Sequence, residues 1–469
     1  MPEQNLKKIV FITEMIGLLF FLFSTNAYAV PSFERQTGME CTTCHTVFPE
    51  LTPFGRTFKL SGYVLSKSSK PYEFPPPLSG MAQLSFTHTD KAQPSGFVED
   101  NWATHITSSG NNILNLPQEL SIFYGGRIIS KIGAFVQGTF DGIGNTFLLD
   151  MTDIRYADNT TLWGKNIIYG LTINNSPTVQ DIWNSTPVWG FPSAKSDFAP
   201  GPSAGTIIDG ALDQQVGGIG AYVFWNNLIY GEITAYHTAK NGIAKPLGAG
   251  TKTEMVVDDI APYWRLALQH QWKEHSLSAG IYGMTANIFP EGNNSGPSDK
   301  FADIAFDAQY QYIGKKHILS AQSSWIHEKQ DWDASFTRGN TANHSNSLNT
   351  FKMNLNYYYR GHFGFIGSHS DSMDMSNSGA IGGSIGYFST TGDKDALLYS
   401  SEQVNGSRTG SPNSNGFIME IDYMPWHKAK LTFQYIIYDK FNGAHSNYDG
   451  FGRDASDNNT LYFLVWLMF

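Results

Sequence analysis

The chain has 469 residues and a formal net charge of −10, with 15% charged and 14% aromatic residues. This acidic balance argues against a nucleic-acid partner, since phosphate backbones are bound by basic surfaces. High aromatic content, low charge and no late apolar run long enough for a helical span are typical of a transmembrane β-barrel. A soluble exported β-sandwich or propeller is the alternative that these features leave open.

The N-terminus predicts a secretory signal peptide over residues 1–29. Lys7 and Lys8 precede an apolar run from residue 9 to residue 23, and Ala27-Tyr28-Ala29 has the small residues of a cleavage site. Cleavage there makes Val30 the first residue of the mature chain. The protein is therefore expected to leave the cytoplasm.

The only two cysteines lie in Cys41-Thr42-Thr43-Cys44-His45, which has the spacing of a c-type haem attachment site. The two thiols can form thioethers to the porphyrin, and His45 is then placed to be the proximal iron ligand. A redox-active pair, a disulfide and half of a metal site are the alternatives. A zinc site would need two further ligands, and the nearest later histidine is His88. We therefore expect one covalently attached haem c.

Residues 30–79 form the predicted haem module. About 50 residues are too few for a stable core, so the module should depend on the haem and on whatever encloses it. A short helix is expected after Thr52 as N-cap, with Pro53 at its first position and Gly62 just past its end. Phe54 and Phe58 would share a helix face that packs on the porphyrin or on the barrel wall.

Two basic residues and several possible sixth ligands accompany this helix. Arg56 and Lys59 are candidates for pairing with the haem propionates, although simple solvation explains them equally well. Met39 and Met81 are candidates for the sixth iron ligand, as are several of the 13 histidines. A methionine ligand would raise the reduction potential of the haem.

A polyproline connector at residues 74–77 leads into a predicted barrel over residues 80–469. Strand-like runs there alternate apolar and polar residues, with tyrosines and tryptophans at girdle positions. Representative outward faces are Met353, Leu355, Tyr357 and Tyr359; Phe306, Ala308, Tyr310 and Tyr312; Leu431, Phe433, Tyr435 and Ile437; and Trp264, Leu266, Leu268 and Trp272. Short connections alternate with long ones, and the longest, residues 176–215, is expected to fold into or over the pore.

The last run, residues 460–469, is apolar on both faces. Its inward set of Tyr462, Leu464, Trp466 and Met468 is unsuited to a water-filled pore, so we expect it to pack against the haem module. Seventeen strand candidates can be counted, with an ambiguous region over residues 362–390. Haem attachment and the C-terminal Phe469 both belong in the periplasm, which requires an even number. We therefore expect 16 antiparallel strands, with 18 as the alternative.

Residues 31–39, the haem motif and residues 46–56 resemble the fused outer-membrane cytochrome–porins of iron-oxidising bacteria. The resemblance is specific over about residues 31–65. Over the barrel, the chain resembles this family in its architecture and in its last strand. It implies an extracellular Fe(II) oxidase of the outer membrane. Its single haem c would sit in the barrel lumen or on the periplasmic side and pass electrons to a periplasmic cytochrome or copper protein.

Two other functions remain open at this point. The protein could be a conduit for a donor or acceptor other than iron, or a diffusion porin in which the haem module is only a plug or sensor. Carboxylates are suitable hard ligands for a passing divalent cation. Candidate acidic residues in loops are Glu99, Asp100, Asp181, Asp258, Asp259, Asp331, Asp333, Asp371 and Asp374.

Overall fold

The computed structural model describes residues 31–65, 76–94, 110–142, 144–239, 246–361 and 379–469. The expected signal peptide lies outside these residues. So do the first half of the Pro-rich connector and part of the ambiguous region over residues 362–390.

A single antiparallel sheet closes on itself, because β1 pairs with β2 on one side and with β17 on the other. In the part of the chain that the structure describes, seventeen strand segments make up 16 wall strands. The short β8 and the longer β9 pair with successive parts of β10 and together act as one interrupted strand, with Asp259 at φ +61° between them. The expectation of 16 strands is thus confirmed, and residues 379–390 of the ambiguous region belong to a wall strand.

The segments, in chain order, are β1 (Leu78–Thr89), β2 (Asn112–Ile129), β3 (Ile132–Asp141), β4 (Thr146–Leu162), β5 (Lys165–Asn174), β6 (Val216–Trp225), β7 (Ile229–Thr238), β8 (Val256–Asp258), β9 (Ala261–Trp272), β10 (His275–Phe289), β11 (Asp299–Ile313), β12 (His317–Asp331), β13 (Ser345–Gly361), β14 (Gly379–Gly392), β15 (Ser414–Trp426), β16 (Ala429–Lys440) and β17 (Thr460–Met468). The barrel therefore begins at Leu78, slightly before the expected boundary at residue 80.

Side chains alternate between the outer and inner faces of the wall, as the period-2 pattern predicts. In β9, Leu266 and Leu268 are about half exposed, whereas the alternating residues Arg265 and Ala267 are buried. The outward Phe306, Met353, Leu355, Tyr357 and Phe433 are exposed in the same way. A closed wall with an apolar outer face leaves no unpaired edge, and this is the structure that lets strands cross a membrane.

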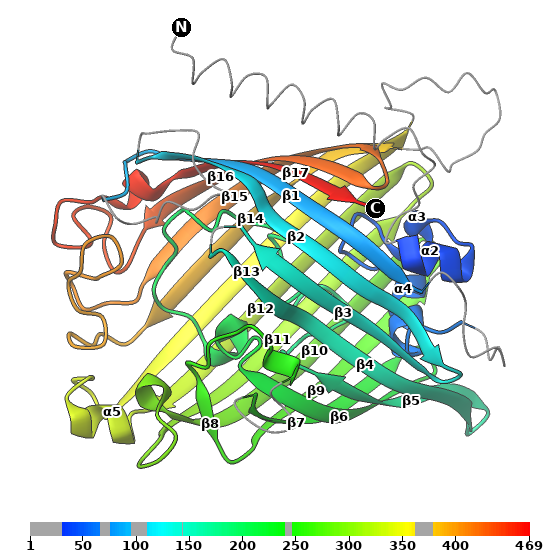
Figure 1. Cartoon of the computed structure of the whole chain (residues 1–469), viewed down its shortest axis with the longest axis horizontal. Coiled ribbons are helices and arrows are strands. Elements are labelled where there is room, and N and C mark those ends of the chain that lie inside the picture. The colour runs from blue at the N-terminus through cyan, green and yellow to red at the C-terminus, as the bar shows by residue number, and fades with distance from the viewer. Residues whose placement is uncertain (1–30, 66–75, 95–109, 143, 240–245, 362–378) are drawn as a thin grey trace, which may run out of the picture.

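The shortest turns and the longest connections lie at opposite ends of the barrel. The β6–β7, β9–β10, β11–β12 and β15–β16 turns are short, while the β5–β6, β12–β13, β14–β15 and β16–β17 connections are long. Figure 1 shows the C-terminus and the N-terminal helices at the end with the short turns, and α5 (Asp333–Arg338) at the other end.

The N-terminal segment, which we define as residues 31–65, contains three short helices: α2 (Pro31–Thr37), α3 (Cys41–Cys44) and α4 (Pro53–Leu60). Helix α4 begins as predicted, with Thr52 accepting a hydrogen bond from the Gly55 amide at 3.1 Å. The predicted apolar face is only partly covered, because Phe58 is buried but Phe54 is 37% exposed. No described helix is both long and apolar enough to span a membrane.

Instead of a helical plug, the N-terminal segment is a set of short helices and turns held by inward-facing side chains of the wall. Arg360 on β13 donates to the His45 and Thr46 carbonyls at 3.2 and 3.1 Å. Ser320 on β12 donates to Glu50 at 2.7 Å, and Phe48 packs edge-on against Trp466 at 5.2 Å between ring centroids. The expectation that β17 offers this segment an apolar inner wall is therefore confirmed.

Candidate functional site

The cysteine motif forms a compact turn. Both cysteines belong to the one-turn helix α3, and the His45 amide donates to the Cys41 carbonyl at 2.8 Å. The Thr52 amide then donates to the Cys44 carbonyl at 2.9 Å, which ties the start of α4 to the end of α3. A side chain at Gly55 would lie 2.2 Å from the same carbonyl oxygen, so glycine permits this close approach.

The two thiols are free and half-buried. Burial raises the pKa of the Cys41 thiol to about 12 and that of the Cys44 thiol to about 11. Both are therefore protonated near neutral pH, whereas a redox-active pair needs at least one thiolate. This environment disfavours the redox-pair alternative.

One ring nitrogen of His45 contacts a backbone carbonyl of the same segment. Its Nδ1 lies 3.3 Å from the Pro49 carbonyl oxygen and can donate to it, which leaves Nε2 as the free nitrogen. Burial lowers the pKa of His45, so the imidazole is neutral near neutral pH. A neutral ring oriented through its other nitrogen is the usual arrangement of a metal-bound histidine.

A cavity of about 550 Å³ lies against this motif. This volume is within the range of roughly 300–1,000 Å³ that is typical of cofactor and small-molecule sites. Cys41, Cys44 and His45 all line the cavity, and its apolar walls come from four parts of the chain. These are Phe33 and Phe58 of the N-terminal segment, Phe123 and Phe135 of β2 and β3, Trp189 and Phe191 of the β5–β6 connection, and Trp466 and Met468 of β17.

Three residues that line this cavity each have a buried polar atom without a hydrogen-bond partner among the described residues. These atoms are the His427 Nε2, the Trp466 Nε1 and the Thr186 Oγ1. Buried polar atoms without a partner cost free energy, so each such atom calls for a ligand or a bound water. A mostly apolar cavity with a few unsatisfied polar atoms suits a flat, largely apolar group with polar edges, and a haem has this character.

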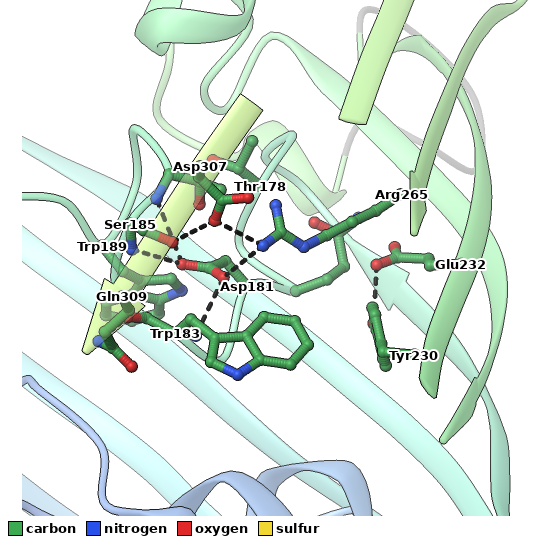
Figure 2. A network of polar contacts seen from close by, with 12 residues as sticks. Thr178, Asp181, Trp183, Ser185, Trp189, Tyr230, Glu232, Arg265, Asp307 and Gln309 are labelled. Atoms are coloured by element: carbon green, nitrogen blue, oxygen red, sulfur yellow. Dashed lines mark hydrogen bonds and ion pairs between the residues drawn. The ribbon is translucent and has the colours of Figure 1, made fainter. Parts of the chain in front are cut away.

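The β5–β6 connection, residues 175–215, folds into the barrel and closes one side of the cavity. Asp181 stabilises this connection, because its carboxylate accepts hydrogen bonds from the Trp183 and Ser185 amides at 3.0 and 3.1 Å. Arg265 of β9 lies 3.8 Å from Asp181 and 2.7 Å from Asp307 of β11. Figure 2 shows how this buried ion-pair cluster holds the connection against the wall. The expectation that the longest connection enters the pore is confirmed.

Arg56 and Lys59 occupy different positions. Arg56 does not line the cavity, and both of its terminal nitrogens hydrogen bond to protein groups, namely the Leu51 carbonyl and the side chains of Gln309, Gln311 and Ser276. Lys59 lines the cavity, donates to the Val179 carbonyl at 2.6 Å and lies over the Trp189 ring. Lys59 is therefore better placed than Arg56 for a propionate, and the pairing of either residue stays a prediction.

Both methionine candidates line the cavity. Met81 is only 4% exposed, and its sulfur lies 3.9 Å from the Gln83 amide nitrogen that donates to it. Met39 is half-buried.

The structure does not gather the acidic candidates that it describes into one site. Asp181 is buried in the ion-pair cluster. Asp258 and Asp331 are the last residues of β8 and β12, Asp259 lies between β8 and β9, and Asp333 begins α5. Glu99, Asp100, Asp371 and Asp374 lie outside the described residues.

One further cluster includes a cysteine of the motif. Single ligand atoms of Glu34, Cys41 and His427 lie within 4.8 Å of one another. A closed zinc site needs a fourth ligand, and an ion here would have to displace the proton of a buried thiol. Sequence reasoning did not single out His427, because it lies in a turn hundreds of residues after the motif. Only closure of the barrel brings the two together.

The described strands form a closed 16-stranded antiparallel barrel, with the cavity inside it. No protein-family model matches the chain, and a search of curated proteins finds no significant match. Among solved structures, the chain is similar to the outer membrane protein OmpT of Vibrio cholerae, with 8% identity, a TM-score of 0.40, and coverage of 84% of this chain and 96% of that one. It is also similar to the outer membrane channel DcaP of Acinetobacter baumannii (10% identity, TM-score 0.43, coverage 84% and 96%) and to an anion-selective porin from Comamonas acidovorans (11% identity, TM-score 0.42, coverage 83% and 98%).

Proposed function

We propose that the cavity holds one haem c, bound through thioethers to Cys41 and Cys44, with His45 as its proximal ligand. The observation that carries this proposal is the cavity itself, which brings the whole motif together with apolar walls and unsatisfied polar atoms. The chemistry that a bound haem supplies is a one-electron Fe(III)/Fe(II) couple. The protein is then an electron-transfer barrel of the bacterial outer membrane.

The position of the cavity fits transfer to a periplasmic acceptor. The N-terminal segment, the C-terminus and the short turns share one end of the barrel, and short turns face the periplasm in outer-membrane barrels. A periplasmic cytochrome or copper protein could approach this end. The electron donor would have to come from the opposite end, through the lumen.

The charge of the cavity favours a cation as that donor. Eight carboxylates and three lysines line it among the described residues. The carboxylates are Glu34, Glu40, Glu119, Asp150, Asp181, Asp197, Asp209 and Asp213. Burial raises the pKa of Asp197 to about 6 and that of Asp213 to about 7, so the negative charge increases as the pH rises through this range. A negatively charged, partly enclosed site attracts small cations.

Extracellular Fe(II) is the donor that we propose, on the basis of the resemblance of the N-terminal segment. Each Fe(II) would give one electron and leave as Fe(III), and the periplasmic acceptor would take that electron in a second step. Because Fe(III) precipitates near neutral pH, oxidation outside the membrane keeps the solid product away from the cell. Carboxylates are suitable ligands for the ion on its way through the lumen.

The test is to add Fe(II) to the purified, oxidised protein and to follow the visible haem bands in a stopped-flow instrument. We expect rapid reduction to the same final spectrum that dithionite gives. Reduction by dithionite but not by Fe(II) would contradict the iron assignment and favour a conduit for another donor or acceptor.

A diffusion channel is the second candidate function. The observation that favours it is the polar inner wall, where Gln309, Gln311, Ser276 and Ser320 face inward. Such a wall suits a water-filled lumen. Single-channel conductance in planar bilayers tests this function. Large open-channel currents from the haem-loaded protein would support it, and we expect small ones because the N-terminal segment and the β5–β6 connection occupy space inside the wall.

A further inference from the structure

His427 lies in the turn between β15 and β16, at the barrel end that carries the N-terminal segment. Its ring lines the cavity, together with His45 and both cysteines. Among the described histidines, these two alone line it. The two imidazoles therefore reach one cavity from elements that are far apart in the sequence.

The free nitrogen of His427 has no protein partner in the described residues. Its Nε2 is buried and makes no hydrogen bond. An orphaned buried nitrogen is costly unless a ligand or a water satisfies it. A histidine that lines the cavity and whose Nε2 has no protein partner is chemically suited to bind a metal ion.

Distances within the cluster support the same interpretation. One nitrogen of His427 lies within 4.8 Å of the Cys41 sulfur, which is the first attachment point of the motif. A haem tethered through that sulfur would therefore be attached close to the His427 ring.

We propose that His427 is the second axial ligand of the haem, opposite His45. This inference rests on the proposed function, since it requires a haem at Cys41 and Cys44. The rival methionines are less well placed. The Met81 sulfur already accepts a weak hydrogen bond from Gln83 and is packed in the cluster that contains Phe48 and Trp466. Met39 is only two residues from Cys41, which restricts its reach to the far side of the ring.

Two imidazole ligands have a functional consequence. A methionine ligand raises the potential of a c-type haem, so a pair of histidines implies a lower potential. Hydrolysis and precipitation of Fe(III) lower the effective potential of the iron couple as the pH rises. A haem with two histidine ligands therefore suits oxidation of Fe(II) near neutral pH better than in strong acid.

The test is optical and electron paramagnetic resonance spectroscopy of the purified ferric protein and of its variants. We expect a low-spin wild type without a sulfur-to-iron charge-transfer band. His427→Ala should become high-spin, and added imidazole should restore the low-spin spectrum. His427→Met should gain the charge-transfer band and a higher potential. His317→Ala is the control, because this exposed histidine lies at the same barrel end and bonds to Tyr357 instead.

Several outcomes would overturn the inference. A high-spin wild type, a low-spin spectrum that survives His427→Ala, or loss of the low-spin state in Met81→Leu or Met39→Leu would each do so. If His427→Ala takes up little haem, the His427→Met variant provides the test instead. A His427→Met protein without the charge-transfer band would contradict the inference. Absence of any covalent haem in the wild type would instead refute the proposed function on which the inference rests.

Discussion

Replacing Arg56 with methionine should loosen the N-terminal segment from the barrel. The guanidinium is fully buried and donates four hydrogen bonds at 2.8 to 3.0 Å. The acceptors are the Leu51 carbonyl, shortly before α4, and side chains on β10 and β11. Burial lowers the pKa of Arg56 to about 9, so it is still charged near neutral pH. Methionine keeps much of the side-chain volume but leaves these acceptors without their donor.

The expected loss of docking free energy follows from two opposing contributions. Hydrogen bonds from a charged donor contribute about 1.5–3 kcal/mol each, but the variant no longer has to desolvate a guanidinium. Removing one partner of a buried charged network typically costs about 3–5 kcal/mol, and we take the lower limit because the charge of Arg56 is not directly paired. At about 1.4 kcal/mol per factor of ten, the docking equilibrium of the segment should fall about 100-fold.

Hydrogen exchange measured by mass spectrometry reports this equilibrium. Peptides from residues 45–63 should exchange about 100-fold faster in Arg56→Met, while peptides from the wall strands should not change. Arg35→Met is the matched control, because Arg35 is exposed in the same segment and, among the described residues, donates to only one wall group, the Leu78 carbonyl of β1. Exchange within about fivefold of the wild type, which is the scale of an exposed ion pair, would refute the reasoning.

Three further predictions concern the cavity and its supports. Gly55→Ala should destabilise docking by about 1–3 kcal/mol, because the new methyl group meets the Cys44 carbonyl at the end of α3. In-gel haem staining of this variant should fall. Gly205→Ala is the control and should match the wild type, because Gly205 has open space around it. Trp466→Ser should release haem at a lower urea concentration, because the inward ring is lost, whereas Phe463→Ser on the outer face should not. Burial lowers the pKa of Lys59 from 10.5 to about 7, so between these values the unfolded segment binds more protons and docking should tighten as the pH rises. The urea midpoint should therefore increase from pH 7 to pH 9 in the wild type, and an equal increase in Lys59→Met would contradict this explanation.

Local patterns were enough to predict the wall. Alternation over β9, β11, β13 and β16 identifies which side chains face outward, because a strand has a period of two and only one face meets lipid. The cap at Thr52 and the start of α4 are also local. Their signals are a side-chain acceptor followed by Pro53, and the structure shows both.

Long-range placement could not be predicted in the same way. The pattern treats Phe54 and Phe58 alike, yet only Phe58 meets the cavity, because burial depends on what surrounds the helix. From the sequence, Arg56 is a candidate for pairing with a haem propionate or for simple solvation. Its actual partners on β10 and β11 are more than 200 residues away in the sequence. The position of His427 beside Cys41 likewise arises from closure of the barrel rather than from any local motif.

The central claim is that Cys41 and Cys44 carry a haem c in the cavity. Intact-mass measurement of the mature protein, made in a host that attaches haem c, tests this claim most directly. We predict the mass of the chain plus one haem, with both cysteines protected from alkylation and the added mass on the peptide that contains residues 41–45. An unmodified mass with two alkylatable thiols, under conditions in which another c-type cytochrome matures normally, would contradict the account.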